Sequence, residues 1–145
     1  MHLFTYGTLM FPSIFASVTG RHQPAHRASL PGHARFCLKS EVYPGIIPSP
    51  GHTTYGIVYF DVDEPGTRKL DIFEGEYYLR TPVRATMEDG RTCDAQTYVI
   101  KDQYRHLLST KKWDVEAFKN NYKNAFRSKY FGFSAICNNK KQSLP

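Results

Sequence analysis

The alternation of apolar and polar positions is clearest between residues 54 and 100, where it predicts three strands. Thr54–Val62 carries apolar residues on both faces, which is typical of a strand inside a sheet. Tyr77–Met87 and Thr92–Ile100 are separated by Glu88-Asp89-Gly90-Arg91, and an Asp-Gly pair between two β-rich runs is a preferred hairpin turn. We therefore expect an antiparallel pair of strands in this part of the chain.

Helical spacing of apolar residues marks three further segments: Leu9–Thr19, Glu64–Phe73 and Trp113–Tyr130. The first has Pro12 near its start and Gly20 after its end, which are the positions that these residue types prefer. Asp63 precedes the second segment, Asp114 lies at the start of the third, and both are predicted to be N-caps.

The remainder of the N-terminal half is less regular. Residues 2–6 predict a short first strand and residues 36–42 another. Between them, residues 21–34 are polar and basic and predict a loop that leads into a strand. Residues 43–51 are so rich in Pro and Gly that only turns and extended chain are expected there.

Composition indicates one globular domain. A chain of 145 residues leaves little room for two domains, and 41% apolar with 22% charged residues argues against disorder and against a membrane bundle. Cys37, Cys93 and Cys137 form no Cys-x-x-Cys pair, which excludes a disulfide framework and a cysteine zinc site and fits a reducing cytosol. The 14% aromatic content indicates either a base-stacking surface or an aromatic core, and the core is the commoner cause.

Positive charge is concentrated toward the C-terminus. Residues 1–100 hold 9 Lys+Arg and 10 Asp+Glu, a net charge of −1, whereas residues 101–145 hold 10 and 3, a net charge of +7. A nucleic-acid-binding domain carries its charge on the folded face that contacts phosphate, so nucleic acid is not the expected partner. No Lys or Arg precedes the apolar stretch at 3–18, and no run reaches about 18–20 apolar residues, so we expect a cytoplasmic protein without a membrane span.

Signatures of several common active sites are missing from the sequence. It contains no Gly-x-Ser-x-Gly, no phosphate loop and no dinucleotide fingerprint. His22 and His26 have a spacing that suits two metal ligands on a helix, but Pro24 lies between them. We therefore expect surface histidines here and no metal site.

The segment Tyr6-Gly7-Thr8-Leu9 is a first candidate for binding. It ends a predicted strand just before a helix, and successive backbone N–H groups at such a junction form a cradle for a carboxylate. The alternative is an ordinary strand-to-helix turn.

A second candidate is the acidic helix end around Phe73, which holds Asp71, Glu74 and Glu76. A carboxylate beside a core-facing Phe73 would be partly buried, and burial raises its pKa toward the working range of a general base. The alternative is a solvated acidic turn.

Five short motifs follow one another along residues 3–100: Tyr6-Gly7-Thr8-Leu9, Tyr43-Pro44-Gly45-Ile46, Gly56-Ile57-Val58-Tyr59, Leu70-Asp71-Ile72-Phe73-Glu74-Gly75 and Tyr78-Leu79-Arg80. Taken together they resemble the gamma-glutamylcyclotransferase-like family, and in particular its AIG2-like branch. The resemblance implies an α+β fold, a small mixed β-barrel with flanking helices around one cavity. This domain would span residues 1–133, and residues 134–145 would form a basic, frayed tail.

The resemblance also implies an enzyme and its site. The α-amine of a γ-glutamyl compound would attack its own γ-carbonyl, release an amine or amino acid and close the ring of 5-oxoproline. The family's catalytic glutamate falls on Glu74, which would act as general acid/base. Seven residues would bind the substrate: Tyr6, Gly7, Thr8, Leu9, Tyr43, Tyr78 and Arg80.

Some of these roles have structural alternatives. As a strand residue, Tyr78 is equally suited to the core, and Tyr43 to shaping the wall of the cavity. Arg80 would either bind a carboxylate of the substrate or pair with Asp71 or Glu76. Glu76 is a rival general base, although the family pattern has its glutamate directly after Phe73.

The implied reaction requires no metal, nucleotide or other cofactor. The expected partner is a small γ-glutamyl molecule, and a monomer is the expected state. Two alternative functions remain: a non-catalytic module that binds a γ-glutamyl or carboxylate ligand, and a protein that binds nucleic acid or an acidic partner through Lys111–Lys141 and nearby tyrosines.

Overall fold

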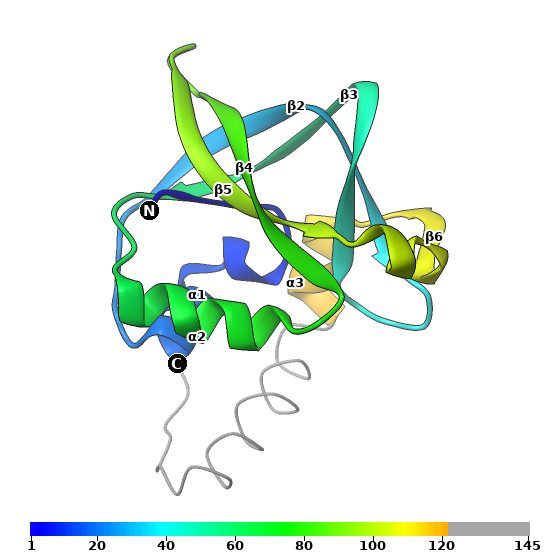
Figure 1. Ribbon diagram of the computed structural model, residues 1–145, viewed down its shortest axis with the longest axis horizontal. Coiled ribbons are helices and arrows are strands. Elements are labelled where there is room, and N and C mark those ends of the chain that lie inside the picture. The colour runs from blue at the N-terminus through cyan, green and yellow to red at the C-terminus, as the bar shows by residue number, and fades with distance from the viewer. Residues whose placement is uncertain (122–145) are drawn as a thin grey trace, which may run out of the picture. The chain divides into compact units, whose positions relative to one another are not determined.

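The computed structural model describes residues 1–121, and its elements follow in the order shown in Figure 1. They are β1 (Leu3–Thr5), the 3₁₀-helix η1 (Thr8–Met10), α1 (Pro12–Thr19), β2 (Ala25–Leu38), β3 (Pro44–Tyr59), α2 (Glu64–Glu74), β4 (Tyr78–Met87), β5 (Thr92–Ile100), the 3₁₀-helix η2 (Asp102–Leu107), β6 (Leu108–Lys112) and α3 (Val115–Asn121).

Five strands of the described chain close into a mixed β-barrel. The neighbours run β3-β1-β5-β4-β2, and a long antiparallel pairing of β2 with β3 completes the ring, while β6 adds to β2. The pairing of β1 with β5 is parallel and the other pairings are antiparallel. Helices α1 and α2 lie together on one side of the barrel (Figure 1). The expected α+β barrel with flanking helices is therefore confirmed, and its cavity stays a prediction.

Apolar side chains from all five barrel strands fill the interior. Phe4, Leu30, Ile46, Val58 and Ala85 belong to one buried cluster. Because each strand sends alternate residues inward, every strand contributes to this core without being apolar throughout. Such packing fixes the ends of β1, β4 and β5, from which the candidate site residues extend.

Three expectations for the N-terminal half need correction. Residues 25–34 are not a loop: they belong to β2, which pairs with β3 over most of its length and shifts register between Pro31 and His33. The strand expected at residues 36–42 is only the end of β2, which stops at Leu38. Residues 44–51 are extended, as expected, but they form the first half of β3 and not turns. Prolines are tolerated in strands at bulges and edge positions, and pairing with a distant segment outweighs the local preference for turns.

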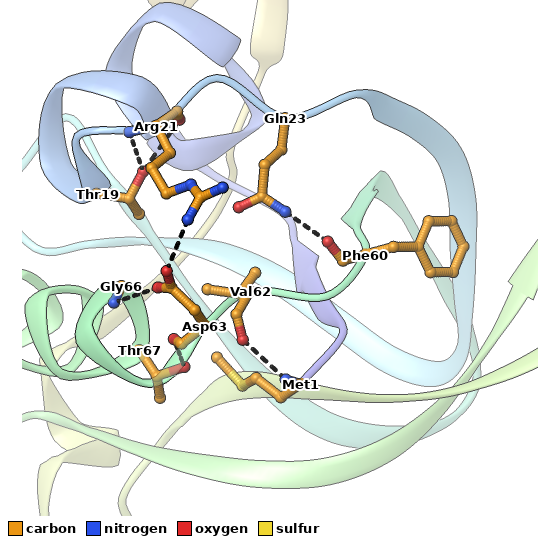
Figure 2. Close-up of polar contacts among 9 residues, drawn as sticks. All are labelled: Met1, Thr19, Arg21, Gln23, Phe60, Val62, Asp63, Gly66 and Thr67. Atoms are coloured by element: carbon orange, nitrogen blue, oxygen red, sulfur yellow. Dashed lines mark hydrogen bonds and ion pairs between the residues drawn. The ribbon is translucent and has the colours of Figure 1, made fainter.

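The start of α2 is anchored by a set of polar contacts drawn in Figure 2. The carboxylate of Asp63 accepts the backbone N–H of Gly66 at 2.8 Å, which confirms Asp63 as the N-cap. Its second oxygen accepts a hydrogen bond from Arg21 at 3.0 Å, and the N-terminal amine of Met1 donates to the carbonyl of Val62 at 2.9 Å. These contacts fix α2, and with it the position of Glu74 at its C-terminal end.

The last described element, α3, begins two residues later than expected. Its first turn is capped by Asp114, whose carboxylate accepts the N–H of Glu116 at 2.9 Å. The remainder of the predicted helix, residues 122–130, and the predicted tail at 134–145 lie outside the described residues. Among the helices of residues 1–121, none has the length and apolar character needed to cross a membrane.

Candidate active site

Glu74 is the last residue of α2, and its half-buried side chain lies in an unusual electrostatic environment. Burial of Leu70 one turn earlier orients this helix end against the barrel, and Gly75 ends the helix with φ of +84°, a conformation that favours glycine. Desolvation by the surrounding protein, followed by repulsion from the Asp71 carboxylate, raises the pKa of Glu74 from 4.5 to about 8. The sequence-based hypothesis of a buried acidic group at this helix end is thus supported for Glu74.

The charge of Glu74 acts on two buried tyrosine side chains, Tyr6 and Tyr98. Burial, and then the charge of Glu74, raises the pKa of Tyr6, which lies directly after β1. Burial also raises the pKa of Tyr98 on β5, with further contributions from Asp71 and Glu74. The hydroxyl of Tyr6 donates to the carbonyl of Tyr98 at 2.6 Å, so the two residues form one unit beside the acidic helix end.

The predicted binding loop, residues 6–9, follows β1 and turns into η1. Thr8 and Leu9 are buried, and the first amides of such a turn have no acceptor within their own helix. Gly7 is required by close packing, because a Cβ there would lie 2.8 Å from Cγ of Pro44. The Tyr59 hydroxyl donates to the carbonyl of Leu9 at 2.8 Å and thereby holds the loop against β3.

Pro44 connects this loop with two more of the predicted site residues. The hydroxyl of Tyr78, the first residue of β4, donates to the carbonyl of Pro44 at 2.8 Å, and Tyr78 is buried. Tyr43 directly precedes Pro44 and is half-buried, and its carbonyl accepts the N–H of Leu38 at 3.1 Å. The structure therefore brings Gly7, Tyr43 and Tyr78 together around Pro44.

The side chains of Arg80 and Glu76 make their contacts away from Pro44, with Asp71 and Tyr104 respectively. Arg80 on β4 makes two hydrogen bonds to Asp71, at 2.9 and 3.3 Å, which is one of the pairings that the sequence left open. Its role in binding substrate stays a prediction. Glu76 is exposed and accepts a hydrogen bond from Tyr104 at 2.9 Å, so it lacks the burial that raises the pKa of Glu74.

Sequence reasoning missed Tyr98 and Arg35 in this region, and it quoted Tyr59 in a motif without giving it a role in the site. Tyr98 contacts both Asp71 and Tyr6. Arg35 on β2 donates to the carbonyls of Tyr6 and Tyr55 at 2.7 and 3.1 Å, and thus supports the loop from the opposite strand. A tyrosine within a strand predicts only packing, because the partner of its hydroxyl comes from elsewhere in the chain.

Within residues 1–121, no three His, Cys, Asp or Glu side chains gather closely enough to hold a metal ion. A surface hollow of about 500 Å³ lies beside α2 and is bordered by Asp71 and Arg80. Glu74 is not among the residues that line it. The site residues therefore offer carboxyl, phenol and backbone amide groups, which suit proton transfer and the binding of oxygen atoms.

Comparison with known proteins identifies the family and the fold of the chain. The family model described as "Gamma-glutamyl cyclotransferase, AIG2-like" matches residues 3–115. AIG2-like protein D of Arabidopsis thaliana is 33% identical over 123 residues, which cover 82% of this chain and 80% of that protein. A solution structure of an Arabidopsis thaliana protein is similar with a TM-score of 0.68 and 29% identity, covering 97% of this chain and 94% of the other.

A solved gamma-glutamyl cyclotransferase, 16% identical, has the same fold with a TM-score of 0.62, over 89% of this chain and 85% of its own. The match of the family model extends from β1 to the start of α3 and includes Glu74 and the loop at 6–9. The chain belongs to the AIG2-like gamma-glutamyl cyclotransferase family.

Proposed function

We propose that the protein is a gamma-glutamylcyclotransferase in which Glu74 is the general acid/base. The observation that carries this proposal is the half-buried Glu74 carboxyl, whose pKa of about 8 is close to neutral pH. A general acid/base is most effective when its pKa lies near the operating pH, and such a group contributes on the order of 10²–10⁴-fold to the rate.

In the proposed reaction, Glu74 carries protons from the α-amine of the substrate to the leaving amine. The carboxylate removes a proton from the α-ammonium of the substrate, and the freed amine attacks the γ-carbonyl carbon to form the ring C–N bond. Glu74 then donates that proton to the nitrogen of the leaving amine, and the original amide C–N bond breaks. The ring nitrogen gives up its second proton through the same carboxylate, so that 5-oxoproline and a protonated amine are released.

The raised pKa of Glu74 suits this sequence because it brings the acid closer to the pKa of the substrate amine. A chain-terminal α-amino group has a pKa of about 7.7–8.0, and the α-amine of a γ-glutamyl compound is more basic because a free carboxylate lies beside it. With an ordinary glutamate at 4.5, the neutral amine beside the neutral acid would be less populated by about 3.5 powers of ten, or about 5 kcal/mol. Burial of Glu74 thus supplies the reactive protonation state of the pair.

Positioning would provide the remainder of the rate enhancement. Because nucleophile and electrophile belong to one molecule, the protein has to hold a folded conformer, and correct orientation can contribute several kcal/mol. The amides of Gly7, Thr8 and Leu9 are suited to bind a carboxylate or carbonyl oxygen of that conformer. Tyr78 and Tyr43 would form the adjoining wall, with Pro44 between them and the loop.

The test is release of 5-oxoproline from a panel of γ-glutamyl amino acids, γ-glutamyl amines and glutathione. We expect Glu74→Gln to abolish turnover while its thermal unfolding stays cooperative. Glu76→Gln is the matched control, because it makes the same change two residues away at an exposed position. We expect this control to retain turnover.

Two outcomes would contradict the proposal. Normal turnover by Glu74→Gln would exclude this residue as the acid/base. Binding of γ-glutamyl compounds, measured by calorimetry, without release of 5-oxoproline from any of them would instead identify a non-catalytic binding module.

A further inference from the structure

Asp71 is held by two side chains from the barrel. Its carboxylate accepts hydrogen bonds from Nε and Nη2 of Arg80 on β4, at 2.9 and 3.3 Å, and from the hydroxyl of Tyr98 on β5, at 2.6 Å. Arg80 also donates to the side chain of Gln96, which fixes the guanidinium from its other side. The Arg80 and Asp71 side chains are 31% and 42% exposed, so this pair lies at the edge of the protein and is reached by water.

This cluster stands directly beside the proposed acid/base. Asp71 precedes Glu74 by three residues on α2, and residues at this spacing are neighbours on one face of a helix. Tyr98, which binds Asp71 through its hydroxyl, accepts the hydroxyl of Tyr6 through its carbonyl. A continuous chain of contacts therefore runs from Arg80 through Asp71 and Tyr98 to the start of the loop at residues 6–9.

We propose that Asp71 is a positioning residue for Glu74, and that Arg80 and Tyr98 act on the reaction by holding the Asp71 carboxylate one helical turn before it. This inference rests on the proposed function of Glu74 and deepens it. It also gives Arg80 a role different from direct binding of substrate, because Nε and Nη2 donate to Asp71 and Nη1 donates to Gln96.

The charges around Glu74 determine in which direction Asp71 shifts its pKa. Three groups from three elements interact electrostatically with Glu74: Asp71 on α2, Tyr6 after β1 and Tyr98 on β5. Burial alone would raise the pKa of Asp71, but the hydrogen bonds from Arg80 and Tyr98 and the Arg80 charge lower it, so Asp71 stays ionised. An ionised Asp71 repels the Glu74 carboxylate and favours its protonated form.

Two substitutions break the same ion pair but have different electrostatic consequences. Asp71→Asn removes the negative charge, so the titration midpoint of Glu74 is expected to fall by about one pH unit. Arg80→Gln leaves the Asp71 charge in place without its compensating cation, so the midpoint is expected to remain or to rise. A merely structural role for the pair would shift both variants in the same direction.

The titration of Glu74 in the full chain is followed by NMR of ¹³C-labelled glutamate side chains, with Glu74→Gln used to assign its resonance. Asp94→Asn is the matched control, because Asp94 on β5 forms an Arg–Asp pair with Arg84 on β4, at 3.1 Å, that includes no residue of α2. We expect this control to leave the midpoint of Glu74 unchanged. The pH dependence of kcat is the second readout and is expected to shift with the midpoint.

The inference is overturned if Asp71→Asn leaves the Glu74 midpoint in place, or if Arg80→Gln lowers it. Should Asp71→Asn fail to fold, Arg80→Gln alone decides by the same criterion. An Arg80→Gln variant with a raised KM, an unchanged kcat and an unchanged Glu74 midpoint would assign Arg80 to the substrate instead. Because the NMR titration uses the free protein, a wild type without turnover would refute the proposed function and leave the titration result standing.

Discussion

Replacement of Glu74 by Gln is expected to change the pH dependence of stability, independently of any catalytic role. The pKa of Glu74 is about 8 in the folded protein, against 4.5 for an ordinary glutamate. Between these values the folded state retains a proton that the unfolded chain has released. Stability therefore falls as pH rises through this range, by about 1.4 kcal/mol per pH unit when the difference in bound protons is one.

The size of this effect follows from the two pKa values. The full difference corresponds to about 5 kcal/mol, of which most is lost between pH 5 and pH 8. Because Glu74 is half-buried and water screens part of its charge, we expect about 3–4 kcal/mol in the measured free energy of unfolding. This is a large fraction of the 5–15 kcal/mol that stabilises a typical domain.

Urea unfolding of wild type and Glu74→Gln at pH 5, 7 and 9 measures this contribution. The variant has no titrating group at position 74, so its advantage over wild type should widen by about 3–4 kcal/mol from pH 5 to pH 9. Any constant difference between Gln and a neutral Glu cancels in this comparison. Glu76→Gln, at an exposed position, should follow wild type at all three pH values. Parallel stability curves for wild type and Glu74→Gln would refute the reasoning.

Three further substitutions test the surroundings of the site. Asp63→Ala removes the N-cap of α2, and urea unfolding should show a loss of about 1 kcal/mol with an unchanged m-value. Tyr78→Phe leaves the buried carbonyl of Pro44 without its hydroxyl donor, and the same measurement should show a loss of about 1–3 kcal/mol. Gly7→Ala would place a Cβ 2.8 Å from Pro44 and displace the loop, so kcat/KM for 5-oxoproline release should fall about 10²-fold in a protein that still unfolds cooperatively.

The elements with strong local signals were predicted from sequence. The hairpin of β4 and β5 has the expected bounds within one residue, because Asp89-Gly90 and the flanking β-rich runs act over a few residues. The N-cap at Asp63 also depends only on neighbours in sequence. By contrast, β2 was missed over residues 25–34 because its stability comes from pairing with β3, whose partner residues are up to 34 positions away, as in Ala25 with Tyr59.

In the candidate site, too, the features with a local sequence signal were predicted and those that depend on distant parts of the chain were not. The resemblance of the motifs located Glu74 and the loop at residues 6–9, and burial of an acidic helix end was a possibility from local sequence alone. Of the partners of that site, the sequence offered the pairing of Arg80 with Asp71 only as one of several alternatives, and it gave no signal for Tyr98. Asp71, Arg80 and Tyr98 come from α2, β4 and β5, and only closure of the barrel brings their side chains within hydrogen-bond distance.

The contact between Tyr6 and Tyr98 has a consequence for mutational tolerance. The acceptor is the main-chain carbonyl of residue 98, which every amino acid carries, so a substitution at 98 that preserves β5 leaves this hydrogen bond available. The donor is a side-chain hydroxyl, which only the residue at position 6 can supply. Variation at 98 would therefore alter the link to Asp71 while the start of the binding loop keeps this anchor, whereas loss of the Tyr6 hydroxyl would remove one of the loop's anchors and leave Asp71 in place. The two halves of the site can thus change separately in sequence, although a single tyrosine joins them in space.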